Sequence, residues 1–422
     1  MTRPPPARDP ARRAVVTGLG AVTPIGNDAD TFWRNLTAGV SGIDRIRSFD
    51  PEGLEVQIAA EVKDFDPRAY IDFKAARRMA RFSHLAVAAA SQAIESSGLE
   101  IGDGNRDDIA VVVNTGGGGM EEVAVEQTTF DQRGGSRVSP FMVPMMSPSM
   151  GACQVSMKYG TRGPVITSVA ACASGVQAFV EAQRLIEHGD VDVAITGGSE
   201  SAIMPLSFAT LANMGALSKR NGDPAAASRP FDAERDGFVF GEAGGIVVIE
   251  AAEHAEARGA TILAEVAGGA LTGDAFHISA PEPSGYGASL AMQRAVRDAH
   301  LELEQVDYVV AHGTSTPLND ATETKAIRAA FGAHADRLAI SSNKSMIGHT
   351  LGAAGAMSAL AAVLAIRDGV IPPTINQEHS DPACDLDYVP NEARHATLNV
   401  AIVNGFGFGG QNAVAVFSRY AG

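Results

Sequence analysis

Short apolar runs rich in β-branched residues and bounded by glycine recur along the chain, separated by Ala-rich segments. Such runs lack the polar–apolar alternation of a half-exposed sheet, so both faces of each strand must be covered. The pattern predicts an α/β fold in which helical layers enclose buried strands. The segments that carry these predicted strands are 14–26, which also contains a glycine turn and a helix start, 110–115, 191–200, 306–316 and 396–410.

A weak internal repeat suggests how the chain is divided. A strand, a turn with reactive side chains and an Ala-rich helix ending at 188–191 recur later as SSNKSMIGHT and a helix ending at 367–370. We therefore predict two similar halves, 14–260 and 261–422, after a disordered tail over residues 1–13.

Charge and composition exclude several classes of protein. The 33 Lys and Arg residues against 49 Asp and Glu residues give a net charge of −16, which argues against nucleic acid or a membrane surface as a partner. The apolar run 351–366 is short for a membrane span and predicts a helix buried inside the protein. Three cysteines and an N-terminus without an apolar core predict a reducing, cytoplasmic location.

The N-terminal sequence VTGLGAVTPIG invites comparison with a dinucleotide-binding loop. Thr23 replaces the third glycine of that pattern and Pro24 follows it, so close approach of a pyrophosphate to a helix N-terminus is not supported. A tight structural turn is the better interpretation.

Cys172 stands where an apolar strand gives way to an amphipathic helix, among small neighbours. Free N–H groups at a helix N-terminus favour a thiolate, which would lower the thiol pKa and create a nucleophile. A buried structural cysteine is an equally good interpretation of this segment alone. Cys153 and Cys384 lack the setting and are interpreted as structural.

Two later segments favour the nucleophile. His312 ends a predicted strand, and Lys344 and His349 lie in a loop that enters a helix. One cysteine, two histidines and a lysine at this spacing are a poor metal-binding set. They suit acyl-thioester chemistry, in which a thiolate takes the acyl group and two neutral imidazoles donate hydrogen bonds to an enolate oxygen. Each histidine taken singly could equally be a buried core residue.

The chain resembles the β-ketoacyl-acyl-carrier-protein synthases of type II fatty-acid synthesis, most closely the elongating synthase II kind. The resemblance covers 14–420. Its specific motifs are ACASG around Cys172, RPFDAERDGFVFGEAGGIVVIE (229–250), HGTSTPLND (312–320), NKSMIGHTLGAAG (343–355), PPTIN (372–376) and NGFGFGGQN (404–412).

The resemblance implies a thiolase-like α-β-α-β-α fold of two similar halves and a cytoplasmic homodimer. It implies that Cys172 is acylated and that His312 and His349 bind the malonyl thioester carbonyl, with electrostatic support from Lys344. Phe408 would gate the site, and its N–H would join that of Cys172 in an oxyanion hole. Further residues implied to bind substrate are Thr314 and Thr316, on the pantetheine arm, and Phe406, Gly407 and Gly409.

Two departures concern the subfamily and the acyl pocket. Ser358 stands where elongating relatives carry a Glu, as in polyketide ketosynthases, and Gly117 stands where many relatives have a bulky aliphatic residue. We expect Gly117 to leave the pocket floor open for medium to long acyl chains. Met120 and Met146 would line this pocket, with Met142 reaching across from the second subunit. Methionine as ordinary core filler is the alternative.

A basic cluster in this acidic chain predicts a landing site for acyl-carrier protein. A solvated helix face is the alternative. The cluster comprises Lys74, Arg77, Arg78 and Arg81, with Arg133 and Arg137 further along.

The implied activity is a decarboxylative Claisen condensation of an acyl chain with malonyl-acyl-carrier protein, which requires no metal or other cofactor. The alternatives are a polyketide ketosynthase and a non-catalytic partner of the chain-length-factor type. The VAACASG setting of Cys172 argues against the first, and intact Cys172, His312 and His349 argue against the second.

Overall fold

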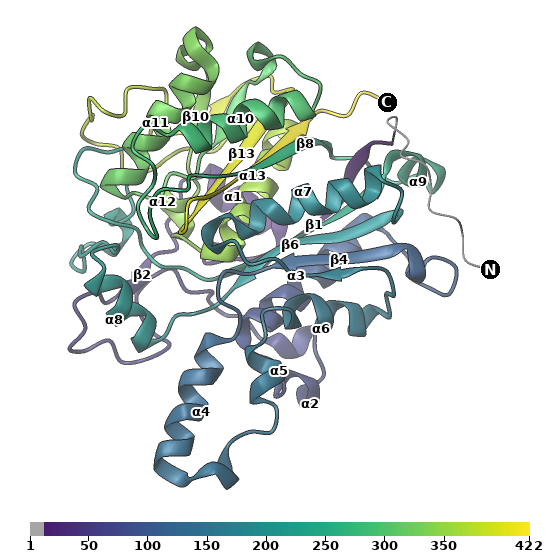
Figure 1. Cartoon of the computed structure of the whole chain (residues 1–422), viewed down its shortest axis with the longest axis vertical. Coiled ribbons are helices and arrows are strands. Elements are labelled where there is room, and N and C mark those ends of the chain that lie inside the picture. The colour runs from purple at the N-terminus through teal and green to yellow at the C-terminus, as the bar shows by residue number, and fades with distance from the viewer. Residues whose placement is uncertain (1–11) are drawn as a thin grey trace.

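A mixed sheet of ten strands runs through the part of the chain that the computed structural model describes, residues 12–422 (Figure 1). The strand order is β10-β9-β13-β14-β8-β1-β7-β6-β4-β5. The strands are β1 (Ala14–Val22), β4 (Ile109–Asn114), β5 (Val165–Ile166), β6 (Val193–Glu200), β7 (Ala243–Ala251), β8 (Ala264–Gly273), β9 (Tyr308–Val310), β10 (Ala339–Ser341), β13 (Val400–Gly407) and β14 (Gln411–Ser418). Two short ribbons pair β2 (Asp44–Arg45) with β3 (Ile58–Ala59) and β11 (Val370–Ile371) with β12 (Arg394–His395).

The sheet has two sides of five strands each, which meet where β1 pairs with β8, and the strands of the two sides follow corresponding orders. Strands that precede residue 252 lie on one side in the order β1-β7-β6-β4-β5, and later strands lie on the other in the order β8-β14-β13-β9-β10. Within the sheet, the two sides pair through only three residues of each strand, 14–16 of β1 and 264–266 of β8. The chain passes from the first side to the second between the end of β7 at Ala251 and the start of β8 at Ala264.

Helices form three layers around the two sides of the sheet. The helices α7 (Ser174–Glu187) and α13 (Ala354–Asp368) contact strands of both sides and lie between them. Outside, α3 (Arg81–Ser97) and α6 (Met150–Tyr159) cover the first side. On the second side α10 (Tyr286–Asp298) covers β8 and β14, and α11 (Pro317–Phe331) packs on α10. This arrangement confirms the predicted layered α/β fold.

The remaining helices lie around these layers. They are α1 (Ala29–Thr37), α2 (Phe73–Ala76), α4 (Met120–Arg133), α5 (Met142–Met146), α8 (Pro205–Asn213), α9 (Ala252–Ala257) and α12 (Lys344–Ile347). In Figure 1, α4 projects away from the body of the protein.

The predicted buried helix is confirmed in α13, where every residue from Ala354 to Ile366 is buried. Among the described residues one helical segment, Leu351–Asp368, is long and apolar enough to cross a membrane, and 83% of it is buried inside the protein. It forms part of the central helical layer.

The tight turn predicted within 14–26 lies at Thr23–Gly26, where the N–H of each of these two residues donates to the carbonyl of the other at 2.8 and 3.3 Å, and not at Gly18 and Gly20. Gly18 and Gly20 lie inside β1, where a side chain on either would overlap a backbone carbonyl oxygen of α3, at Ala93 and Ala89 respectively. The glycines are therefore required for close helix–strand packing. The first helix begins only at Ala29.

Most of the predicted tail, residues 1–11, lies outside the described residues. The prediction of disorder is wrong for Arg12 and Arg13, because both are held by the folded chain. Arg12 pairs with Asp192 and Glu253, and Arg13 pairs with Glu265.

Replacing Gly20 with alanine tests the packing of α3 on β1. We expect Gly20→Ala to lower the free energy of unfolding by about 3 kcal/mol, because a backbone carbonyl cannot yield as a flexible side chain would. Chemical denaturation measures the change. Gly104→Ala is the matched control, since its added Cβ meets nothing within 4 Å; equal losses in both variants would contradict the packing argument.

Candidate active site

A cleft of about 350 Å³ brings together most of the predicted catalytic residues. Of the predicted site residues, it is lined by Cys172, His312, Thr314, Thr316, His349, Phe406, Gly407 and Phe408. Lys344 is buried and lies near enough to change the pKa of Cys172 and of both histidines. Residues more than two hundred positions apart in sequence thus share one cavity.

Cys172 lies in a tight turn, Ala171–Ala173, that leads directly into α7. Ala171 has φ +47°, a conformation that non-glycine residues rarely adopt. Ser174 stabilises the turn, since its Oγ accepts the N–H of Ala170 at 2.9 Å and donates to the carbonyl of Ala171 at 2.7 Å. The turn holds the sulfur at the wall of the cleft.

The predicted low pKa of Cys172 is wrong. Burial raises the pKa of the Cys172 thiol to about 12, against the lowering effects of Lys344 and of the N–H groups of Phe408 and Cys172. Desolvation of a thiolate thus outweighs the nearby positive charge and N–H donors in the resting site. The thiol is protonated at neutral pH and must lose its proton as it attacks.

His312 and His349 face one another, with ring centroids 5.3 Å apart and planes at 86°. Burial, followed by the charge of Lys344, holds the pKa of each imidazole well below its usual value. Both rings are therefore neutral at pH 7 and each carries one N–H donor. Neutral donors are what the predicted enolate stabilisation requires.

Glu323, which sequence reasoning missed, is the buried carboxylate on the Lys344 side of the site. It accepts the N–H groups of His312 and Gly313 at 2.8 Å and the amide of Asn404 at 3.0 Å. Burial lowers the pKa of Lys344 to about 8, and the charge of Glu323 opposes that decrease.

Ser358 occupies the position where the sequence suggested that a carboxylate was missing. It is buried in α13, and its Oγ has no hydrogen-bond partner within residues 12–422. The countercharge for Lys344 comes instead from Glu323 on α11. Glu323 lies three residues after the motif HGTSTPLND, and that position was the available signal.

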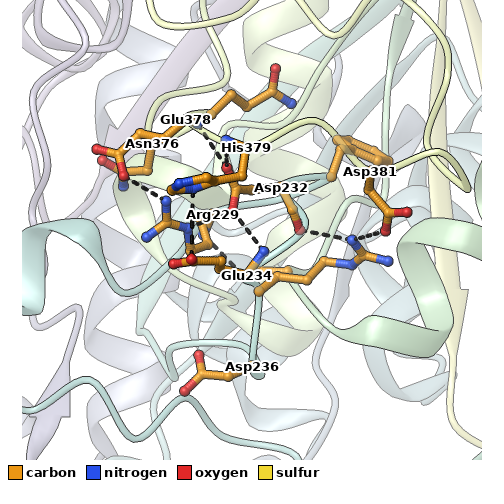
Figure 2. Close-up of polar contacts among 12 residues, drawn as sticks. Arg229, Asp232, Glu234, Asp236, Asn376, Glu378, His379 and Asp381 are labelled. Atoms are coloured by element: carbon orange, nitrogen blue, oxygen red, sulfur yellow. Dashed lines mark hydrogen bonds and ion pairs between the residues drawn. The ribbon is translucent and has the colours of Figure 1, made fainter.

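An ion-pair cluster that includes Arg229, Asp232 and Asp381 (Figure 2) fixes the loop that carries Thr314 and Thr316. Arg235 donates to the carbonyl oxygens of Thr316 and Pro317 and pairs with Asp381. The Thr314 and Thr316 hydroxyls lie 2.9 Å apart on the cleft wall. The loop is held through its backbone, which leaves its hydroxyl groups facing the cleft.

Asp232 ties this cluster to the segment 376–381 (Figure 2). Its carboxylate accepts the N–H groups of Glu378 and His379 at 2.7 Å each and the Nε of Arg229 at 3.0 Å. The motif beginning RPFD therefore has a structural role behind the cleft.

The glycine-rich turn after β13 closes over Cys172. The N–H groups of Phe408 and of Cys172 both lie near enough to the sulfur to lower the pKa of the thiol, so the two predicted oxyanion donors lie together. A Cβ on Gly407 would lie 2.5 Å from the carbonyl oxygen of Ala170. Phe408 is 37% exposed, and Gly409 has φ +82°.

The predicted acyl-pocket residues do not line this cleft. Met120 and Met146 are 46% and 37% exposed, and Met142 is half-buried on α5. Gly117 adjoins Met120, whose sulfur would lie 2.9 Å from an added Cβ. In the single chain these residues belong to the surface formed by α4 and α5.

The basic cluster is only partly available to a partner. Lys74, Arg77, Arg78, Arg133 and Arg137 are exposed. The prediction for Arg81 is wrong, because its guanidinium binds both oxygens of Glu242, whose side chain is only 3% exposed. A charge committed to a buried carboxylate does not serve a protein surface.

Comparisons with known proteins agree with this geometry. The family models Beta-ketoacyl synthase, N-terminal domain, and Beta-ketoacyl synthase, C-terminal domain, match residues 11–255 and 263–378. Proteins named 3-oxoacyl-[acyl-carrier-protein] synthase 2 are similar at full length. The one from Synechocystis sp. is 49% identical and the one from Coxiella burnetii 47%, over 97% of this chain and 98% and 99% of theirs.

Solved structures are similar as well. A Beta-ketoacyl synthase from Burkholderia phymatum has a TM-score of 0.90 at 36% identity, over 97% of this chain and 100% of that one. A type II PKS acyl-carrier protein in complex with its ketosynthase has a TM-score of 0.89 at 32% identity, with the same coverage. The fold and the cleft define a condensing enzyme of the thiolase-like class. This chain belongs to the beta-ketoacyl synthase family.

Removing Arg81 tests its assignment as a structural residue. We expect Arg81→Ala to lower the free energy of unfolding by about 2 kcal/mol, because it leaves the buried Glu242 carboxylate without its cation. The loss is not larger because the half-exposed arginine is partly screened by solvent. Denaturant titration measures it, with Arg77→Ala as the control. Equal stability of the two variants would show that Arg81 belongs with the exposed residues of the basic cluster.

Proposed function

We propose that this chain elongates fatty acids by decarboxylative condensation of an acyl chain on Cys172 with malonyl-acyl-carrier protein. The observation that carries the proposal is the shared cleft of one buried thiol and two neutral imidazoles, with Lys344 beside them. The similarity of 47 to 49% to proteins named 3-oxoacyl-[acyl-carrier-protein] synthase 2 favours fatty-acid elongation over the polyketide alternative.

In the first half-reaction the Cys172 sulfur attacks the thioester carbonyl of the acyl-carrier substrate. The N–H groups of Cys172 and Phe408 stabilise the tetrahedral oxyanion. The bond from the acyl carbon to the carrier sulfur breaks, and the carrier leaves as a thiol with the proton that Cys172 gives up. The N-terminus of α7 and the charge of Lys344 favour the transient thiolate.

In the second half-reaction malonyl-acyl-carrier protein enters the same cleft. His312 and His349 donate hydrogen bonds to its thioester carbonyl, and the bond to the carboxylate breaks to release carbon dioxide and leave an enolate. The enolate carbon attacks the acyl carbon, and the Cys172 sulfur leaves as a thiolate, which takes up a proton from solvent to restore the resting thiol. The product is a 3-oxoacyl thioester two carbons longer, and the chemistry uses only side chains and thioester substrates.

Acyl-carrier protein is the proposed macromolecular partner. A structural relative is described as a ketosynthase in complex with an acyl-carrier protein. In this chain Lys74, Arg77, Arg78 and Arg137 offer exposed positive charge, while Thr314 and Thr316 offer hydroxyls to the pantetheine arm. Positive charge on an acidic chain would steer an acidic carrier to these exposed basic side chains.

A homodimer is proposed from the surface of α4 and α5. No residue of α4 is buried, although Val125 and Phe130 are apolar and 53% and 54% exposed, and Val143 on α5 is 71% exposed. A second copy would cover this surface, and Gly117, Met120, Met142 and Met146 would then line the acyl pocket.

The three cysteines are free, as suits the cytoplasmic location proposed here.

Alanine variants separate the two half-reactions. Cys172→Ala should reduce condensation at least about a thousandfold, because the acyl acceptor is lost. His312→Ala and His349→Ala should still form acyl-Cys172 but decarboxylate malonyl-carrier about a hundredfold more slowly. Mass spectrometry of the acyl adduct and release of carbon dioxide measure the two steps; condensation retained by Cys172→Ala would refute the nucleophile.

Charge reversal tests the carrier surface. The triple variant Lys74→Glu, Arg77→Glu, Arg78→Glu should raise the KM for acyl-carrier substrates about tenfold and leave a small soluble thioester unaffected, because only the carrier carries the opposing charge. The effect should weaken at high salt. Arg184→Glu, at the far end of α7 from Cys172, is the control; equal increases for both substrates would indicate damage to the fold.

A further inference from the structure

Glu200 is a fully buried carboxylate near the nucleophile that neither half-reaction uses. It is the last residue of β6 and is 0% exposed. Within residues 12–422 no lysine, arginine or histidine forms an ion pair with it. A buried carboxylate without a cation must obtain its stabilisation from hydrogen bonds.

Two backbone turns supply those hydrogen bonds. One carboxylate oxygen accepts the N–H of Gly116 at 2.6 Å and the N–H of Gly352 at 3.1 Å. The other accepts the hydroxyl of Thr115 at 3.1 Å. The two glycines are necessary for this approach, because a Cβ on Gly116 would lie 2.8 Å from the carboxylate and one on Gly352 would overlap the backbone of Gly116.

The same turns adjoin the residue that precedes the nucleophile. The Cβ position of Gly116 lies 3.4 Å from the carbonyl oxygen of Ala171 as well as 2.8 Å from Glu200. The Oγ of Ser174, which stabilises the nucleophile turn, also lies within hydrogen-bond distance, 3.2 Å, of the carbonyl oxygen of Thr115. Glu200 is thus connected through Thr115 and Ser174 to the turn that holds Cys172.

We propose that Glu200 is a positioning residue: its carboxylate holds the 115–117 turn and the Gly352 turn around Ala171, and its charge restrains the reactivity of Cys172 above neutral pH. The inference rests on the proposed role of Cys172 as the nucleophile. In this proposal the Glu200 carboxylate acts on Cys172 in addition to the N–H groups of the oxyanion hole.

The charged groups around both residues define the expected pH dependence. The turns packed on Glu200 present N–H groups and the Thr115 hydroxyl, whereas Cys172 shares its cleft with His312 and His349 and is subject to the charges of Lys344 and Glu200. Burial raises the pKa of Glu200 to about 7, and its negative charge raises the pKa of Cys172. Below pH 7 Glu200 is neutral and the restraint is absent; above pH 7 it is present.

Alkylation of Cys172 by iodoacetamide, followed by peptide mass spectrometry between pH 6 and 9, tests the proposal. Glu200→Gln should react about three- to tenfold faster than the parent protein at pH 8.5. The two proteins should agree within about twofold at pH 6, where the parent carboxyl is protonated. A ratio that does not change with pH would overturn the proposal, because a purely structural role would give a uniform offset.

Two further variants complete the test. Glu250→Gln removes a buried carboxylate at the opposite end of the same strand pair, where Glu250 faces Val193 and Glu200 faces Ala243. The Glu250→Gln protein should be less stable than the parent, but the alkylation rate of its Cys172 should depend on pH as it does in the parent. If its alkylation rate instead depended on pH as expected for Glu200→Gln, the proposal would be overturned.

Thr115→Val provides a second route if Glu200→Gln fails to fold. It removes one donor to the carboxylate and should move the onset of the restraint to higher pH, while an unmoved onset would overturn the proposal. Alkylation does not depend on turnover. Failure of the proposed function would instead appear as the absence of an acyl adduct on Cys172.

Discussion

The contact on which the site depends is the backbone approach of the two central helices, α7 and α13, at their N-termini. A Cβ on Gly175 would lie 2.7 Å from the backbone nitrogen of Ala356, and a Cβ on Gly355 would overlap Val176. No side chain larger than hydrogen fits between the helices at these points. Because they meet so closely, the turn that carries Cys172 lies directly against the segment that continues from His349, and the two sides of the sheet share one cleft.

Burial then determines the chemistry of that cleft. Removing water favours the neutral form of each titratable group, so both imidazoles remain neutral and the thiol is protonated. Lys344 is the buried cation that opposes this effect for the thiol and reinforces it for the histidines. A single lysine can therefore serve both half-reactions, because its charge favours a transient thiolate and disfavours imidazolium in the same cavity.

Carboxylates hold the backbone of the site in a recurring manner. Glu323 binds the N–H groups of His312 and Gly313, and Glu200 binds those of Gly116 and Gly352. Burial raises the pKa of both carboxyl groups, that of Glu200 to about 7; the charge of Glu323 raises the pKa of Lys344, and that of Glu200 raises the pKa of Cys172. The same hydrogen-bonding role thus has different electrostatic consequences, according to the charge that lies nearby.

The sequence by itself determined the features that depend on neighbours along the chain: the buried strands at 110–115 and 191–200, the apolar helix of α13, and the motifs around Cys172, His312 and His349. Only the tertiary structure decided that Gly18 and Gly20 belong to a strand and that Arg81 is committed to Glu242. It also decided that Cys172 is protonated at rest. Desolvation, ion pairing and steric contact arise between segments far apart in sequence, so local patterns do not encode them.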